Sequence, residues 1–197
     1  MFFTHEFQDV WEYWLSICGN NIIPNKKDFD PAALSAQLGE IGIFDWEGDE
    51  LYLRVLGSDI IEEIGVDFSG HKLLSKGLPS VTGFAKAYFR TIFNFPCGLQ
   101  TISVERKRSG LLVEAALLFL PLDVEGRNDN QILVYRQHLA SAGYDSKYPD
   151  FVHLGINQII MIDLGCGTPD IDLEKQLEKT RFLSDEKKGL FHKLLLR

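Results

Sequence analysis

The chain has 197 residues, of which 45% are hydrophobic and 24% are charged, as in an ordinary soluble globular domain. Its net charge of −8 argues against nucleic-acid binding, because a basic surface is needed to displace counterions from phosphates. The 3 cysteines are far apart and form no CxxC pair, and the N-terminus shows neither a leader nor an apolar span. We therefore expect a cytoplasmic protein with no structural zinc, no membrane segment and no nucleic-acid partner.

The first predicted element is an amphipathic helix within residues 1–20. Thr4 is its expected cap, and apolar residues recur at helical spacing behind it. The stripe includes Trp11, Trp14 and Leu15, which must be covered by other groups. Two interpretations stay open: this face packs on the domain's own sheet, or it forms the interface of a homodimer.

A linker, a short helix and a hairpin are predicted next. Asp30-Pro31 is typical of a helix start, with aspartate as the cap and proline in the first turn, and the helix is expected to reach Leu38. The apolar runs Ile41–Trp46 and Leu51–Leu56 predict two antiparallel strands joined by a polar turn.

The stretch Leu51–Leu74 predicts a strand, a short helix and a tight turn. Ser58 or Asp59 is the expected cap of that helix, and Gly65 is its expected end.

Three short motifs carry a resemblance to a known family. Arg54-x-x-Gly57-Ser58 and Gly65-x-Asp67-Phe68-x-Gly70 resemble the strand-to-helix segment of the PAS sensor family. Asp28-Phe29-Asp30-Pro31 resembles the entry region of its compact bacterial branch, whose members often stand alone without an output domain. The resemblance implies an α+β fold with a PAS-like antiparallel sheet of five or six strands and helices on one face. An N-terminal amphipathic helix and a C-terminal helical tail would flank it, with the PAS-like domain at residues 21–165 and the tail at 166–197.

The second half of the chain predicts a long helix and more strands. Ser80 is the expected cap of the helix, which the resemblance places across the sheet. Four strand-like runs follow: Leu99–Lys107, Leu111–Leu120, Gln131–Leu139 and Ile159–Ile162. In the first run, Thr101, Ser103 and Glu105 alternate with apolar residues, so that side of the strand is expected to meet water. Ala140–Gly155 is expected to be an insertion, and either of the last two runs is a candidate for the last core strand.

The resemblance also implies a ligand pocket between the long helix and the inner face of the sheet. Its expected walls are Val55, Phe84, Tyr88, Leu117 and Phe119, and its expected polar contacts are Arg54, Tyr88 and His71. Each of these residues also has a purely structural interpretation: the aromatic residues as core, Arg54 as the partner of a carboxylate, and His71 as a turn residue.

Haem and flavin are not expected as cofactors. Haem-binding PAS domains resemble one another in a histidine on the long helix, and residues 80–94 contain none. Flavin-binding PAS photosensors resemble one another in an Asn-Cys-Arg motif, which is absent. The ligand that the resemblance leaves open is an unidentified small apolar molecule.

One stretch resembles a cofactor-binding motif of enzymes. Residues Ile160 to Pro169 resemble the first motif of S-adenosylmethionine-dependent methyltransferases, although Pro169 stands where that motif has a glycine. The histidines show no metal-binding spacing, and no serine lies in a nucleophile elbow, so neither a metal site nor a catalytic residue is expected.

These observations lead to three hypotheses. The favoured one is a sensory or regulatory module of bacterial signalling that binds a small apolar ligand, or none, and acts through dimerisation and contact with an unidentified signalling protein. The second is a protein-interaction adaptor with a filled core and no ligand. The third is a methyltransferase that uses the Gly165-Cys166-Gly167 loop.

Overall fold

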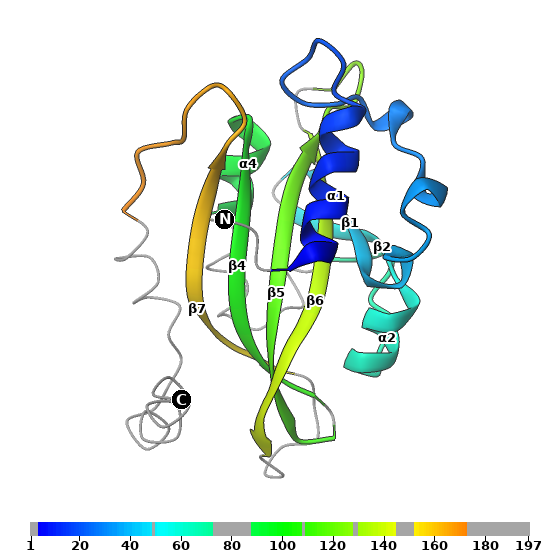
Figure 1. Ribbon diagram of the computed structural model, residues 1–197, viewed down its shortest axis with the longest axis vertical. Coiled ribbons are helices and arrows are strands. Elements are labelled where there is room, and N and C mark those ends of the chain that lie inside the picture. The colour runs from blue at the N-terminus through cyan, green and yellow to red at the C-terminus, as the bar shows by residue number, and fades with distance from the viewer. Residues whose placement is uncertain are drawn as a thin grey trace.

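The computed structural model describes residues 4–48, 50–72, 88–107, 109–127, 130–144 and 152–172. Within these ranges, one antiparallel sheet of seven strands forms the centre of the molecule (Figure 1). In sheet order the strands are β3 (His71–Lys72), β2 (Glu50–Leu56), β1 (Ile41–Glu47), β6 (Gln131–Tyr144), β5 (Leu111–Leu122), β4 (Cys97–Arg106) and β7 (Val152–Asp163). This sheet confirms the expected antiparallel α+β fold.

The strand order decides which run is the last core strand. β6 pairs with β1 on one side and β5 on the other, so Gln131–Leu139 lies inside the sheet. β7, which contains Ile159–Ile162, pairs with β4 at the edge of the sheet. Much of the expected insertion Ala140–Gly155 is strand, because β6 continues to Tyr144 and β7 begins at Val152. β7 is therefore an addition to the five neighbouring strands β2, β1, β6, β5 and β4.

The α-helices begin and end largely where local sequence predicts. α1 (His5–Ser16) follows Thr4, whose hydroxyl accepts a hydrogen bond from the Phe7 amide, which confirms the expected cap. α2 (Ser58–Ile64) ends at Gly65, which has a φ of 80° in the left-handed region that glycine favours. Its N-cap is Gly57 and no side chain caps it, contrary to the prediction for Ser58 or Asp59. Within the described ranges, no helix is long and apolar enough to cross a membrane.

The segment between α1 and β1 forms 3₁₀ turns, named η1 (Lys26–Asp28), η2 (Pro31–Leu34) and η3 (Leu38–Glu40). Asp30 caps η2 through a hydrogen bond from the Ala32 amide to its carboxylate, 3.0 Å long. The prediction of one helix to Leu38 is wrong, because η2 ends at Leu34. Leu34 is the buried residue of that turn and Leu38 is 43% exposed, so a helix extended to Leu38 would gain little from packing.

Part of the predicted helical structure lies outside the described residues. The helix expected from Ser80 is described from Tyr88 onward and ends with α4 (Arg90–Asn94). Phe84 and the helices expected after Asp172 are not among the described residues.

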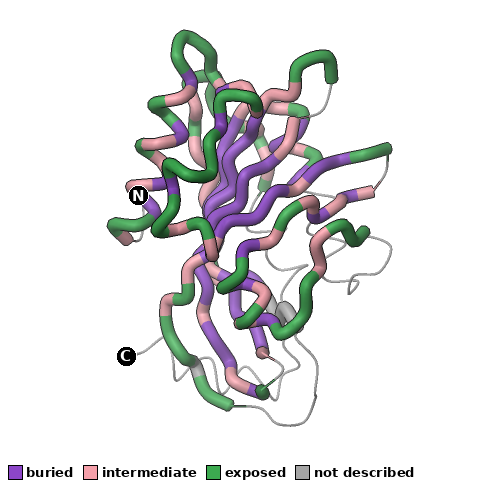
Figure 2. The backbone as a smooth tube through the Cα atoms, turned by 90° about the vertical axis from the view of Figure 1, so that its right-hand side faces the viewer, coloured by how far each residue is buried: buried purple, intermediate pink, exposed green. Residues whose placement is uncertain are grey.

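Each face of the sheet carries its own hydrophobic cluster. We call the face that carries Leu99 and Phe119 the inner face, and it packs against α4. The outer face carries Leu118 and Leu133 and packs against α1. Figure 1 shows α1 in front of the sheet and α4 behind it, and Figure 2 shows buried residues following the strands between them.

The polar side of β4 does not meet water, so that prediction is wrong. Thr101, Ser103 and Glu105 are 1%, 2% and 4% exposed. β5 and β7 flank β4 on both sides, and alternation places these three residues on the inner face together with Leu99. Polar side chains thus lie inside the molecule, where hydrogen-bonding partners must replace water.

Candidate functional site

An aromatic cluster lines the inner face where α4 meets the sheet. The centroid of the Phe89 ring lies 5.1 Å from that of Phe119 and 5.3 Å from that of Phe44. Leu117 packs against this cluster, and Tyr88, which belongs to it, is 1% exposed. The structure therefore brings together three of the expected pocket residues, namely Tyr88, Leu117 and Phe119.

The Tyr88 phenol stays protonated in this environment. Burial, with a further contribution from the charge of Asp172, raises the pKa of Tyr88 to about 12. A neutral phenol retains a proton to donate. Asp172 follows β7, so the part of the chain beyond the added strand contributes to the electrostatics of the inner face.

Thr101 places a hydroxyl on the apolar part of the inner face. It lies opposite Leu117 of β5 and Ile159 of β7. In the part of the chain that the structure describes, its Oγ1 is buried and has no hydrogen-bond partner. A buried hydroxyl without a partner costs about 1–3 kcal/mol, so a small molecule that reaches it gains by hydrogen-bonding to it.

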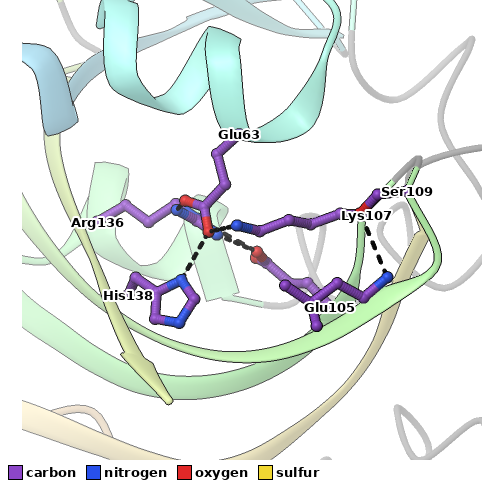
Figure 3. Close-up of polar contacts among 7 residues, drawn as sticks. Glu63, Glu105, Lys107, Ser109, Arg136 and His138 are labelled. Atoms are coloured by element: carbon purple, nitrogen blue, oxygen red, sulfur yellow. Dashed lines mark hydrogen bonds and ion pairs between the residues drawn. The ribbon is translucent and has the colours of Figure 1, made fainter. Parts of the chain in front are cut away.

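Further along the same strands, charged residues replace the aromatic ones and form a network, shown in Figure 3. Arg136 of β6 donates to Glu105 Oε2 from Nε at 3.2 Å and from a terminal nitrogen at 2.7 Å. Its other terminal nitrogen donates to Glu63 of α2. Glu63 Oε1 also lies 2.6 Å from Lys107 Nζ and 2.9 Å from His138 Nδ1. We call these five residues the inner network; they join α2 to β4, β6 and the turn after β4.

Within the inner network, Glu63 and Arg136 are both held in their charged forms. Burial opposes the charge on Glu63, but the Arg136 guanidinium, Lys107 and His138 outweigh it and lower the pKa of Glu63 to about 2. Burial likewise opposes the charge on Arg136, while Glu105 and Glu63 raise its pKa above the ordinary value. The side chains of Arg136 and Glu105 are 6% and 5% exposed, so each depends on the other for compensation.

Sequence patterns alone do not identify the inner network. Arg106-Lys107-Arg108 predicts a solvated turn, but Arg106 is 3% exposed and Lys107 pairs with Glu63, so that interpretation is wrong for these two residues. The available signal is weak: alternation places Glu105 on the same side of its strand as Leu99, and Arg136 on the same side as Val134, and charges on a core side are rarely buried unless they are paired.

Three other expected pocket residues, Arg54, Val55 and His71, do not join the inner cluster. Arg54 Nε lies 3.1 Å from Asp45 Oδ2 on the outer face, and Arg54 also pairs with Glu47. This agrees with the structural interpretation of Arg54 as the partner of a carboxylate. Val55 is 52% exposed, and His71 is an exposed residue of β3 whose Nδ1 lies 3.1 Å from the Ser69 carbonyl oxygen.

The tryptophans of α1 contribute to the outer-face core. Trp14 is 1% exposed and donates from Nε1 to the Pro121 carbonyl oxygen at 3.0 Å. Trp11 stacks on it with centroids 5.6 Å apart, and Leu15 is 46% exposed. Packing of α1 on the domain's own sheet therefore accounts for Trp14, whereas Trp11 and Leu15 retain surface for another contact.

In the methyltransferase-like loop, the acidic residue Asp163 hydrogen-bonds to amides of the loop itself. Asp163 Oδ1 accepts hydrogen bonds from the amides of Gly165 and Gly167 at 2.7 and 2.8 Å. The preceding strand lies at the edge of an antiparallel sheet, whereas that motif belongs to a parallel, doubly wound one. Among the described residues, His, Cys, Asp and Glu form no group of three that could hold a metal ion.

Comparison with known families agrees with this fold. A family model described as a PAS domain matches residues 3–135, more than half of the chain. The chain therefore belongs to the PAS-domain family, whose members are in general sensory and regulatory modules rather than enzymes. The matched region ends within β6 and excludes β7. A search of curated proteins finds no match.

Proposed function

We propose that the inner face of this PAS domain senses a small, largely apolar molecule and passes the signal on by protein contact, as a regulatory module in bacterial signalling. The observation that carries the proposal is the buried Thr101 hydroxyl beside the aromatic cluster. An apolar surface with one placed polar group is typical of a small-molecule site. The ligand would have an apolar body and one group that hydrogen-bonds Thr101.

The inner network offers a path by which such binding would reach the surface. Glu63 belongs to α2, and its partners belong to β6 and to the turn after β4. A ligand that displaces β4 would move Glu105 and Arg136 and alter how α2 is held. α2 would then present a changed surface to a signalling partner.

A second candidate function is a ligand-free adaptor, because the aromatic rings of the inner face already contact one another. The Trp46 and Phe93 rings, for example, lie 5.7 Å apart, in addition to the contacts of Phe89. In this alternative the surface of α1 around Trp11 and Leu15 would form a homodimer or bind the partner protein.

Native mass spectrometry of the purified protein, followed by denaturing extraction, separates the two functions. A reproducible bound small molecule that also raises the melting temperature supports the sensor. Thr101→Val should abolish that rise while preserving the fold, and Val66→Ala serves as a control at an exposed position after α2. Protein with nothing bound, and with no ligand-induced rise, would contradict the sensor and favour the adaptor.

A further inference from the structure

The outer face of the sheet carries a cleft that the inner-face proposal does not use. Its volume is about 900 Å³, within the range of roughly 300–1,000 Å³ found for small-molecule sites. The cleft lies between the β1–β2 hairpin and the segment of η1, η2 and η3. Its apolar lining includes Phe29, Ile41, Ile43, Val55 and Leu56.

Gln131 gives the cleft a fixed acceptor. Its Nε2 donates to Asp45 Oδ2 at 3.3 Å, and the same carboxylate is held by Arg54 and Arg127. Because the amide nitrogen must face the carboxylate, Oε1 is the atom left to accept a hydrogen bond. Gln131 Oε1 is buried and has no partner within the described ranges, and Gln131 lines the cleft.

The charged lining is mainly cationic. Lys26 and Arg54 contribute positive charges, and Asp59 contributes a negative one. The Arg54 side chain is bound to Asp45 and Glu47 and is still 33% exposed. The Lys26 ammonium lies 5.3 Å from the centre of the Phe29 ring, which places a cation directly beside an apolar wall.

We propose that this cleft is a second binding site, for a small amphipathic anion. Its apolar body lies against Phe29, Ile43 and Val55, an N–H or O–H group donates to Gln131 Oε1, and its acidic group lies near Lys26 and Arg54. The site is on the opposite face of the sheet from Thr101, so it is independent of the proposed sensing site. A ligand here contacts both the β1–β2 hairpin and the segment that follows α1.

The test uses anilinonaphthalene sulfonate, which combines an apolar aromatic body, one N–H group and one anionic group. We expect its fluorescence to report saturable binding to the wild-type protein. Val55→Trp fills the cleft and should weaken binding at least tenfold, whereas Val66→Trp, outside the cleft, should leave it unchanged. Gln131→Met removes the acceptor and should weaken binding by about three- to tenfold.

Further measurements test the same site without relying on the folding of Val55→Trp or Gln131→Met. Phenylnaphthylamine, which lacks the sulfonate group, should bind more weakly than anilinonaphthalene sulfonate. Lys26→Gln should reduce the difference in affinity between the two probes. Amide signals of the wild-type protein that shift when anilinonaphthalene sulfonate is added should map to η2, η3 and β2. Thr101→Val should leave the affinity for this probe unchanged. Signals that map to the inner face, or equal affinity in Val55→Trp and wild type, would overturn the proposal.

Discussion

Two charge clusters, one on each face of the sheet, have opposite polarity. On the inner face, the buried cation Arg136 lies between the carboxylates of Glu105 and Glu63. On the outer face, the buried carboxylate of Asp45 lies between Arg54 and Arg127.

The partners of the two clusters differ in exposure. Glu105 and Glu63 are 5% and 14% exposed, whereas Arg54 and Arg127 are 33% and 32% exposed. Burial of Arg136, Glu105 and Glu63 makes these three charges of the inner network interdependent. The arginines of the outer cluster remain hydrated, so they can also interact with a ligand.

The comparison predicts its largest effect at Arg136. Arg136→Met should lower the free energy of unfolding by about 3–5 kcal/mol, because it leaves two buried carboxylates without their main cation. Urea denaturation measures the loss. The double variant Arg136→Met/Glu105→Leu should recover most of it, since an apolar pair of similar size replaces the ion pair. A loss below about 1 kcal/mol would contradict the interdependence of the inner network.

Acid should destabilise the protein through Glu63. Its pKa falls from 4.5 to about 2 on folding, which corresponds to stability on the order of 3 kcal/mol at neutral pH. Because the folded pKa is the lower one, this contribution is complete above pH 4.5 and is lost as the pH falls toward 2. Denaturation curves across that window should show the loss, and Glu63→Gln should reduce it. An unchanged pH dependence in the variant would refute this assignment.

Loss of the central charge of the outer cluster, Asp45, should destabilise the protein less than loss of Arg136 from the inner network. Hydrogen bonds from Arg127 and Arg54 outweigh burial and hold the pKa of Asp45 below its usual range. Asp45→Asn keeps the shape of the side chain and leaves two arginines that water can solvate, so we expect a loss of about 1–2 kcal/mol. The same urea experiment tests this value. A loss as large as that for Arg136→Met would remove the distinction between the two faces.

The smallest effect on stability is expected at Thr101. Replacing its buried hydroxyl with the methyl group of valine keeps the shape and removes a polar group without a partner in the described structure. Thr101→Val should therefore raise the free energy of unfolding by about 1 kcal/mol. Thermal denaturation of the ligand-free protein measures this change in stability. A clear loss of stability would mean that the Thr101 hydroxyl already has a hydrogen-bond partner.

Local features of the fold were predictable from sequence. The hydroxyl of Thr4, the left-handed Gly65 and the alternating hairpin strands act within a few residues of chain, where capping and periodicity are informative. The grouping of Tyr88, Leu117 and Phe119 followed from the family resemblance, which supplies the tertiary arrangement that periodicity lacks.

The placement of the polar residues was not predictable in the same way. Alternation put Thr101 and Glu105 on one side of β4, but it could not tell a buried side from an exposed one. That depends on β7 closing the edge beyond β4 and on Arg136, 31 residues away in sequence, reaching Glu105. Arg54 was likewise assigned to the pocket. The pairing of β1 with β2 shifts register between Ile43 and Phe44, and the ion pair with Asp45 holds Arg54 on the outer face.

The sequence by itself determined the class of fold and the approximate positions of α1, α2 and most of the strands, because hydrogen bonding and side-chain periodicity along the backbone are local. Only the tertiary structure decided which charges are buried together and which face of the sheet carries a cleft. Glu63 and Arg136 are 73 residues apart, and their interaction exists only because the strand order places β6 beside β5 and beneath α2. Electrostatic interactions of this kind depend on distance and burial in space, and neither quantity is encoded in spacing along the chain.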